Sequence, residues 1–233
     1  MAPQNRPLEK IFNDITASYD RMNRLLTLGM DQRWRKKAVR ILLESRPRRI
    51  LDLCTGTGDF AFLIADAAMV GSTVTAIDYS RPMLDRAAEK AEVERRIQFL
   101  LGDAADLPFD DDSYDAIGIS FAFRNLTYKN QNRNASLCEV RRVLRPGGIF
   151  VIVESSQPRF LPIRLLRDRY VDRMVARRAA RISGHQPAYR YLADSVKRFY
   201  TPQEIEQLLN THGFRSIKHH GLFFGAVAIT TAT

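Results

Sequence analysis

The stretch LDLCTGTGDF at residues 51–60 holds the first residues whose types and spacing could do chemistry. Gly56 and Gly58 allow a ligand to approach the backbone where a side chain would block it, and Thr57 between them adds a hydroxyl group. The helix expected after this loop would turn its free N–H groups and its positive end toward the same ligand. The stretch therefore predicts a site for a cofactor that contains a nucleoside.

Three acidic residues accompany the glycine loop. Asp52 lies inside the preceding strand, Asp78 follows about twenty residues later, and Asp103 ends a later strand together with Ala104. The glycines, Ala61 and Asp78 would also suit NAD, but dinucleotide fingerprints usually carry an apolar residue at the position of Asp52. Asp78 could accept hydrogen bonds from a ribose diol, and Asp103 could accept one from the amine of adenine. This arrangement resembles the class I S-adenosylmethionine-dependent methyltransferases, and turn or cap roles are the structural alternative for Asp78 and Asp103.

The elements that must position these residues alternate along the chain. Between residues 46 and 156, apolar runs typical of strands are separated by segments with helical spacing. Strands separated by helices of roughly ten to fifteen residues imply right-handed βαβ units. We therefore predict an α/β fold with a Rossmann-like, doubly wound and mostly parallel sheet of seven strands, with helical cap elements.

The alternation is interrupted once and then resumes. Residues 157–200 are rich in arginine and helical in spacing. The stretch TPQE that follows predicts a capping box, with Thr201 as the N-cap, Pro202 at the first helical position and Glu204 reaching back. Two final strands lie close enough in sequence to pair as a hairpin. The predicted segments are an N-terminal helical lid at 1–45, a cofactor-binding core at 46–156, a basic helical insertion at 157–200, and a C-terminal helix and hairpin at 201–233 that complete the core.

Composition and charge restrict the location and the partners. The formal charge is +10 with a pI near 9.9, which favours nucleic acid, an acidic small molecule or a lipid surface. No apolar run approaches the ~18 residues of a membrane span, and MAPQNRPLEKIF lacks the apolar core of a signal peptide, so we expect a cytoplasmic protein. Cys54 and Cys138 lack CxxC spacing and are interpreted as reduced thiols. The four histidines show no ligand spacing, so no metal is expected.

The stretch YDRMNRLLTLGMDQRW at residues 19–34, which precedes the first strand, indicates a family. It is similar to the first signature of the ubiquinone/menaquinone C-methyltransferase family. The matching residues are Tyr19, Asp20, Met22, Asn23 and Trp34. Thr27 and Asp31 stand where that family usually has Ser and His, and Asp31 reverses the available charge.

Two further stretches carry the same resemblance. RVLRPGGIFVIVESS at residues 142–156 is similar to the second signature of the family, and SFAFRN at 120–125 resembles its Arg-Asn pair after the fourth strand. LTYKNQNRNASL, which follows that pair, departs from the commoner acidic version. The resemblance covers nearly the whole chain.

The resemblance implies transfer of a methyl group from S-adenosylmethionine to a ring carbon of a prenylated quinol. The implied cofactor contacts are Asp52, Gly56, Thr57, Gly58, Asp78, Asp103, Ala104 and Ser120. The implied catalytic residues are Arg124, Asn125 and Tyr19. We favour demethylmenaquinol as the substrate, with a benzoquinol of the ubiquinone pathway as the alternative.

The reaction places a demand on the catalytic residues. A ring carbon is nucleophilic when electron density is pushed from a phenolate, and a free phenol has a pKa on the order of 10. Arg124 could stabilise that anion or orient a water that takes the proton, while Asn125 and Tyr19 hold a hydroxyl group or the water. Asp103 and Asp106 are expected to fix the guanidinium of Arg124.

The tail of such a quinol lies in a bilayer, and the insertion could meet it there. In residues 159–182, Ile163, Leu166, Tyr170 and Met174 recur at helical spacing among many arginines. This pattern is typical of a basic amphipathic helix, so we expect a peripheral contact with anionic lipid on the inner face of the cell membrane. The alternative is a solvated basic face on a helix that packs against the core.

Other classes of function fit less well. A nucleic-acid methyltransferase would share the core and the positive charge, but an amino-N enzyme would usually have [D/N]PP[Y/F] where this chain has SFAFRN. A non-catalytic protein that only binds the cofactor is opposed by the presence of all three acids. The sequence leaves a homo-oligomer open.

Overall fold

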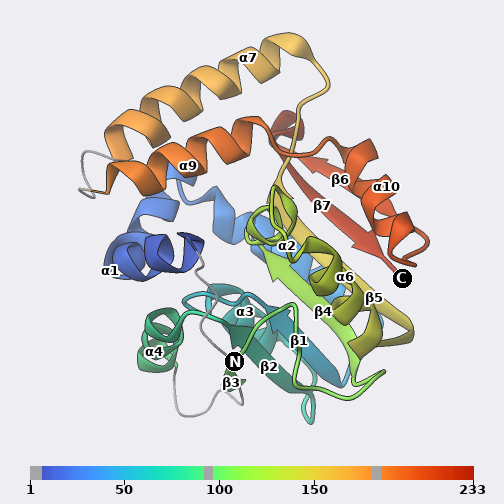
Figure 1. Cartoon of the computed structure of the whole chain (residues 1–233). Helices are drawn as coiled ribbons and strands as arrows, with labels where there is room; N and C mark the ends of the chain where they lie inside the picture. The colour runs from blue at the N-terminus through green and yellow to red at the C-terminus, as the bar shows by residue number, and fades with distance from the viewer. Residues whose placement is uncertain (1–6, 92–96, 180–184) are drawn as a thin grey trace.

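Within the described residues, a sheet of seven strands lies at the centre in the order β3-β2-β1-β4-β5-β7-β6 (Figure 1). The computed structural model describes residues 7–91, 97–179 and 185–233. The strands are β1 Arg49–Leu53, β2 Thr73–Asp78, β3 Ile97–Leu101, β4 Tyr114–Ser120, β5 Leu144–Ser155, β6 Lys218–Leu222 and β7 Val227–Ala232. β1 to β5 are parallel, and β7 pairs antiparallel with β5 and β6. The predicted α/β fold with a mostly parallel, seven-stranded sheet is confirmed.

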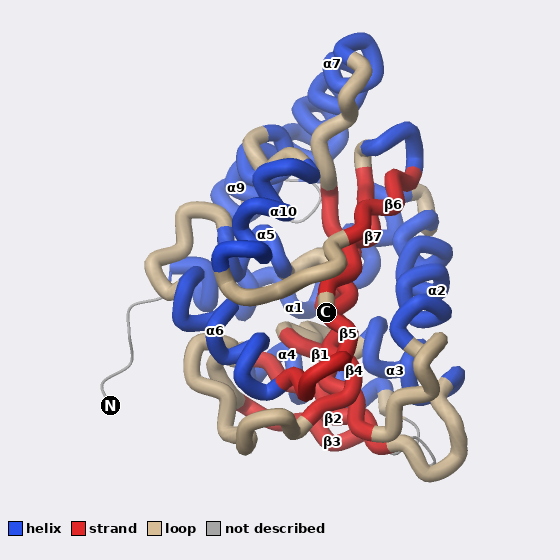
Figure 2. Tube along the Cα trace, turned by 90° about the vertical axis from the view of Figure 1, so that its right-hand side faces the viewer, coloured by secondary structure: helices blue, strands red, loops and turns tan. Residues whose placement is uncertain are grey.

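Helices cover both faces of the sheet (Figure 2). α2 (Met30–Leu42) and α3 (Asp59–Ala67) lie on one face. α5 (Phe123–Thr127), α6 (Arg133–Val143) and α10 (Pro202–Thr211) lie on the other. Because both faces are covered, the central strands β1, β2 and β4 are buried along almost their whole length and carry mainly apolar side chains. Asp52 in β1 is an exception, a buried carboxyl group between the fully buried Leu51 and Leu53.

Two local signals in the sequence are confirmed. The hydroxyl of Thr201 accepts the N–H of Glu204, and the carboxylate of Glu204 accepts the N–H of Thr201 at 2.7 Å, which is the capping box of α10. β6 and β7 form the expected hairpin, joined through the short helix η2 (Phe223–Gly225).

The end of β4 differs from the sequence prediction. The apolar run SYDAIGISFAF at residues 113–123 predicts a strand over its whole length, but β4 ends at Ser120, because Phe121 adopts φ +56°, which a strand cannot accommodate. The chain then turns directly into α5. Arg124 and Asn125 consequently lie in a short helix.

The start of β5 also differs. The helical pattern NASLCEVRRVL at residues 134–144 predicts a helix closed by the Pro-Gly-Gly at 146–148, with a strand after it. In the structure the helix ends at Val143, and β5 begins at Leu144 and includes the Pro-Gly-Gly. The register of β5 against β4 shifts between the pairs Tyr114–Leu144 and Ala116–Ile149. This irregularity accommodates the additional residues within one strand.

Two groups of helices lie at the carboxyl ends of the parallel strands (Figure 1). The first group consists of α1 (Pro7–Thr27) and α4 (Arg81–Lys90), the helix that follows β2, and these two helices contact each other. The insertion consists of α7 (Leu161–Tyr170), the π-helical η1 (Val171–Ala179) and α9 (Gln186–Lys197). An apolar cluster joins α1 to the insertion through Met22, Val171, Val175, Tyr189 and Ala193.

The two predicted helices that reach beyond these elements are described only in part. The helical patterns of PMLDRAAEKAEVE at residues 82–94 and of residues 159–182 predict helices whose last residues, 92–94 and 180–182, lie outside the described residues. Among the helices that the structure describes, none combines the length and apolar character needed to cross a membrane.

Candidate active site

The glycine loop joins the end of β1 to the start of α3. Gly58 adopts φ +83°, and a Cβ atom there would lie 2.9 Å from the ring of Phe62, so a larger residue would clash as well as strain the backbone. Gly56 adopts φ +56° and has open space where its side chain would be. The loop can therefore bring backbone N–H groups against a ligand.

Asp78 at the end of β2 ties two loops together. Its carboxylate accepts hydrogen bonds from the N–H of Gly56 at 2.8 Å and from the N–H of Ser80 at 2.9 Å. Burial raises the pKa of Asp78, and these backbone donors oppose that rise. The carboxylate thus lies beside the glycine loop, where the sequence predicted a ribose-binding acid.

Asp52 is the least satisfied carboxyl group of the site. One of its oxygens accepts a hydrogen bond from the hydroxyl of Thr55, while Oδ1 is buried and has no partner among the described residues. Burial raises the pKa of Asp52 to about 7, and the charge of Asp78 adds to the rise. A ligand with an ammonium group would satisfy the orphaned oxygen and favour the ionised form.

The pKa of one thiol, that of Cys54, is affected by all three predicted acids, so these acids lie near one another. Burial raises the pKa of Cys54 well above its ordinary value, and the negative charges of Asp78, Asp52 and Asp103 raise it further. Asp103 follows β3, where its Oδ1 accepts the N–H of Ala105 at 3.1 Å, and Ala104 beside it is buried. The sheet order therefore brings acids from β1, β2 and the end of β3 to one edge.

α1 is fastened over the glycine loop. Asp20 accepts hydrogen bonds from the hydroxyl of Thr57 and, at 2.8 Å, from Nζ of Lys90, which also binds Asp59 at 2.7 Å. Thr57, expected to contact the cofactor, thus uses its hydroxyl to hold α1. The sequence analysis did not single out Lys90, which ends α4 and has no local signal of its role.

Arg124 is buried at the start of α5 and is held from two other elements. Nη1 lies 2.7 Å from Oε1 of Glu154 at the end of β5 and donates to the hydroxyl of Ser155 at 2.9 Å. Nε donates to the hydroxyl of Ser195 in α9 at 3.0 Å. The expectation that Asp103 and Asp106 fix this guanidinium is wrong, because the end of β5 is the neighbour of β4 in the sheet.

Asn125 follows Arg124 and turns toward α9. Its Oδ1 accepts a hydrogen bond from the hydroxyl of Tyr191 at 3.4 Å. Burial raises the pKa of Tyr191, and the positive charge of Arg124 opposes the rise. α5 and α9 thus carry neighbouring groups that can hold a hydroxyl of a ligand.

Tyr19 interacts electrostatically with charged groups from both halves of the site. Burial raises the pKa of its phenol, whereas a hydrogen bond with Asn23 and the positive charges of Arg35 and Arg124 lower it. The negative charge of Asp78 raises it. Tyr19 in α1 therefore lies within electrostatic reach of both arginines and of an acid beside the glycine loop.

Arg35 in α2 was missed by the sequence analysis. It forms a buried ion pair with Asp31 one turn earlier, and its Nε donates to Ser120 at 3.0 Å. Its guanidinium also lies 5.3 Å from the centre of the Phe121 ring. Asp31 and Arg35 are four residues apart on one helix, and this spacing was the available signal. Asp31 therefore serves to hold a cation, a task that histidine would perform poorly.

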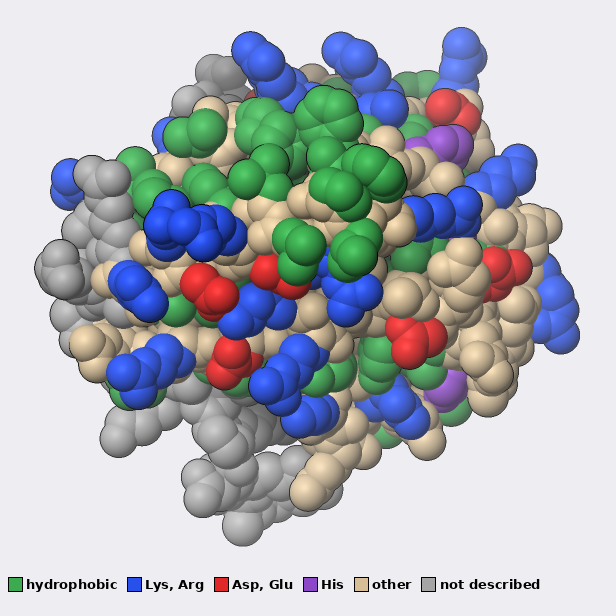
Figure 3. All heavy atoms as spheres, turned by 90° about the horizontal axis from the view of Figure 1, so that it is seen from above, with side chains coloured by type: hydrophobic (Ala, Val, Ile, Leu, Met, Phe, Trp, Pro, Cys, Tyr) green, Lys and Arg blue, Asp and Glu red, His purple; other side chains and the backbone are tan. Residues whose placement is uncertain are grey.

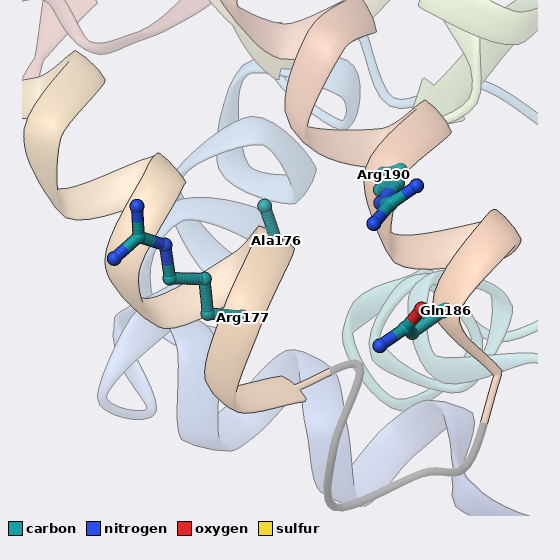
Figure 4. A pocket seen from close by; sticks show the side chains of 4 residues that line it. All are labelled: Ala176, Arg177, Gln186 and Arg190. Atoms are coloured by element: carbon teal, nitrogen blue, oxygen red, sulfur yellow. The ribbon is translucent and has the colours of Figure 1, made fainter.

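A separate pocket lies between η1 and α9 in the insertion. It is lined by Ala176, Arg177, Gln186 and Arg190 (Figure 4). The side chain of Arg177 extends away from that of Arg190, so the two arginines do not converge on a common anion. The pocket adds no residue to the site at the strand ends.

The site combines two chemical capabilities. The glycine loop and its acids can hold a nucleoside ligand that carries an ammonium group. Two buried guanidinium groups, of Arg35 and Arg124, act electrostatically on the phenol of Tyr19, and groups of this kind can stabilise an oxyanion. Ser120 links the two halves through Arg35.

Comparison with known proteins gives consistent matches. The model of the ubiE/COQ5 methyltransferase family matches residues 1–233. A demethylmenaquinone methyltransferase of Thermus thermophilus is 40% identical over 94% of this chain and 97% of its own length. Another of Thermotoga maritima is 38% identical over 94% and 93%, respectively. A ubiquinone/menaquinone biosynthesis C-methyltransferase of Geotalea daltonii is 34% identical over 99% of this chain and 97% of its own.

Solved structures with low identity show the same fold. A SAM-dependent methyltransferase of Thermotoga maritima is 20% identical, with a TM-score of 0.66 over 96% of this chain and 98% of that one. Human N-acetylserotonin methyltransferase in complex with SAM is 17% identical, with a TM-score of 0.64 over 97% of this chain and 59% of that one.

Proposed function

The chain belongs to the ubiE/COQ5 methyltransferase family, and on that premise we propose that it methylates a ring carbon of demethylmenaquinol with S-adenosylmethionine. The observation that carries this proposal is the pair of buried guanidinium groups, of Arg35 and Arg124, that act electrostatically on the Tyr19 phenol. The same phenol also interacts electrostatically with Asp78 beside the glycine loop. One site would therefore hold both the cofactor that donates the methyl group and the arginines that activate the quinol. Family membership does not favour a nucleic-acid methyltransferase.

The residues of the glycine loop suit the cofactor. S-adenosylmethionine supplies an electrophilic methyl group on a positively charged sulfonium. The orphaned Oδ1 of Asp52 would accept from the ammonium of its methionine part, and the carboxylate of Asp78 from its ribose. The loop itself, with Gly56, Thr57 and Gly58, would contact the methionine part. Asp103 with Ala104 would hold the adenine, and Ser120 would line the reactive end.

Arg124 and Arg35 would activate the quinol. Ionising a phenol of pKa ~10 at neutral pH costs about 4 kcal/mol, because each pKa unit corresponds to about 1.4 kcal/mol. Each guanidinium already has a carboxylate partner, Glu154 or Asp31, so the pair adds little net charge. Their fixed N–H donors would therefore provide most of the stabilisation of the phenolate.

Tyr19 and Asn125 would position the substrate hydroxyl or the water that accepts its proton. Asn125 lies next to Arg124 in α5, and Tyr19 comes from α1 on the opposite side. A methyl transfer gains much of its rate from such placement, since reacting groups held in line avoid the entropy cost of meeting. The N-terminal helical segment at 1–45 would then act as the lid that closes the site.

A peripheral membrane contact is the second part of the proposal. Exposed apolar side chains begin the insertion: Phe160, Leu161, Leu165 and Leu166 are each 60–67% exposed. Arg164 and Arg169 are exposed on the same helix. This face differs from the predicted one in part, since Ile163 and Met174 are half-buried. Apolar residues among arginines suit the surface of an anionic bilayer on the cytoplasmic side.

Turnover with labelled cofactor tests the catalytic part. Purified protein is given S-adenosylmethionine with a labelled methyl group and either a short-tailed demethylmenaquinol or its benzoquinol counterpart, both chemically reduced. We expect label in the naphthoquinol product, and none with the oxidised quinone, whose ring carbon is not nucleophilic. Label mainly in the benzoquinol would move the substrate to the ubiquinone pathway. Label in neither quinol would overturn the proposal.

A further inference from the structure

Four aromatic side chains from three parts of the chain form a continuous row, which we call the aromatic row. The ring centres of Phe224 and Phe223 are 5.9 Å apart, those of Phe223 and Trp34 are 6.1 Å apart, and those of Trp34 and Phe121 are 6.2 Å apart. η2 contributes the first two rings, α2 the third, and the turn after β4 the fourth. Such distances are those of aromatic side chains in contact.

The aromatic row leads from solvent to the candidate active site. Phe224 is 78% exposed and Phe223 is 52% exposed, whereas Trp34 and Phe121 are half-buried. At the inner end, Phe121 lies under the guanidinium of Arg35, which in turn bonds Ser120. The row therefore ends at the residues expected to meet the reactive end of the cofactor.

The backbone holds these rings in strained conformations. Phe121, Phe223 and Phe224 adopt φ values of +56°, +45° and +56°, a region that a bulky side chain rarely enters. Strain of this kind persists where the surrounding structure imposes it, and it clusters at functional sites. Phe224 in particular combines strain with exposure, so its ring contributes little to the folded core.

The outer end of the aromatic row opens on an apolar face of the molecule. η2 lies beside the chain that leads into α7, since the N–H of Ser156 donates to the carbonyl of Ala226 at 2.9 Å. Phe160 and Leu161 follow a few residues later and are 66% and 61% exposed. The view from above shows hydrophobic side chains gathered on this side of the molecule, with Lys and Arg side chains around them (Figure 3). A ligand that passes along the row can thus emerge at an apolar surface.

We propose that the aromatic row binds the isoprenoid tail of the substrate and directs it from the site to the apolar face. The inference rests on the proposed function, because it assumes a prenylated substrate. A flexible hydrocarbon chain suits a row of ring faces that offers mainly apolar contact along its length. A folded protein or a second copy would cover the outer two rings but would not reach Phe121 and Arg35.

Trp34 provides a direct test, because it is the only tryptophan in the sequence. The probe is geranylgeraniol, an isoprenoid alcohol without a quinol ring, added to the full chain in dilute detergent. We expect the emission of Trp34 to shift to the blue on binding, because the chain displaces water from a half-buried indole. No shift at any concentration below the solubility limit would overturn the inference.

Two variants and a control distinguish binding of geranylgeraniol to the aromatic row from non-specific binding to exposed apolar residues. Phe223→Ala should weaken the binding of geranylgeraniol about tenfold, as the loss of one aromatic contact implies. Phe224→Gly should also weaken it, yet keep or raise the melting temperature, because glycine relieves the positive φ. Val70→Ala, at a fully exposed apolar residue between α3 and β2, should change neither. Unchanged affinity in both phenylalanine variants would contradict the inference.

Turnover distinguishes failure of this inference from failure of the proposed function. With detergent-solubilised quinols, Phe224→Gly should raise KM for a long-tailed demethylmenaquinol about tenfold and leave the tail-less quinol unaffected. If the parent enzyme is active and the variant prefers the long-tailed quinol to the same degree as the parent, the role of the aromatic row in tail binding is refuted, while the proposed function stands. A parent enzyme that methylates neither quinol would refute the proposed function instead.

Discussion

Arg124 and Glu154 form an ion pair of 2.7 Å in which both side chains are almost completely buried. The same carboxylate also accepts the backbone N–H of Arg124 at 3.1 Å and the N–H of Ser155 at 2.7 Å. Glu154 thus fixes the side chain of Arg124 and the start of α5 together. Together with the bonds to Ser155 and Ser195, this relationship holds the guanidinium of Arg124 in one position.

Glu154→Gln should destabilise the protein by about 3 kcal/mol, because removing one partner of a buried pair leaves an uncompensated charge. Urea denaturation measures the change in the free energy of unfolding. Asp85→Asn is the matched control, since its pair with Arg81 is 2.8 Å long but largely exposed, and it should cost less than about 0.5 kcal/mol. Equal losses in the two variants would show that burial of the pair has no energetic consequence.

Tyr19→Phe should lower kcat on the order of 10²-fold while leaving the affinity for S-adenosylhomocysteine unchanged. The phenol lies within reach of both arginines, so its hydroxyl is expected to act on the quinol rather than on the cofactor. Tyr170→Phe is the control, because that hydroxyl donates to the carbonyl of Leu26 at an exposed position. A variant of Tyr19 with full kcat would remove this residue from the mechanism.

Asp52 makes the stability of the ligand-free protein depend on pH. Its pKa is about 7 in the folded state and about 3.9 in the unfolded state, so the folded state binds the additional proton between these values. The parent should therefore lose up to about 4 kcal/mol relative to Asp52→Asn as the pH rises from about 4 to about 8, with most of the loss below 7 and nothing further above about 8. Parallel stability curves for the two proteins would contradict the raised pKa.

The same titration should govern cofactor affinity. If the ionised carboxylate of Asp52 receives the ligand ammonium, the affinity for S-adenosylhomocysteine should increase as the pH rises toward 7 and stay constant above it. Below pH 7 the increase should be up to about tenfold for each pH unit. Calorimetry from pH 5.5 to 8 measures this profile. Asp52→Asn should bind weakly with a flat profile, and a steep profile in that variant would assign the titration to another group.

Lys90→Met should loosen α1 from the glycine loop. Burial alone would raise the pKa of Asp59, but the hydrogen bond and charge of Lys90 hold it below the ordinary value. Loss of Lys90 removes contacts to both Asp20 and Asp59, so we expect protease cleavage within α1 to become about tenfold faster. Lys36→Met, at an exposed lysine of α2, should not change the cleavage rate. Equal cleavage rates in the two variants would show that the contacts of Lys90 with Asp20 and Asp59 do not hold α1 in place.

Replacement of Leu165 and Leu166 by glutamate should abolish sedimentation with anionic vesicles at low salt. The two side chains are 60% and 67% exposed, and their loss removes apolar burial while adding repulsion from the lipid. Leu101→Glu is the control, because Leu101 is 55% exposed in β3 at the far edge of the sheet. A parent protein that fails to bind such vesicles would end the membrane proposal.

The sequence determined the features that depend on local patterns. The alternation of apolar runs and helical segments predicted the sheet, TPQE predicted the start of α10, and two signatures indicated the family. These features were accessible because capping, periodicity and motif spacing involve residues close together in the chain. The acids at or near the carboxyl ends of β1, β2 and β3 could also be placed at one edge, since parallel strands end on the same side.

The tertiary structure decided the partners of the charged groups. Arg124 could not be assigned to Glu154, 30 residues away, or to Ser195, 71 residues away, by any local rule. Arg35 was missed because its helix lies over Ser120, 85 residues further along the chain. The aromatic row likewise joins rings from α2, the end of β4 and η2. Strand order and helix packing fix such pairs, because the energy of a buried charge depends on what surrounds it in space and not on its neighbours in sequence.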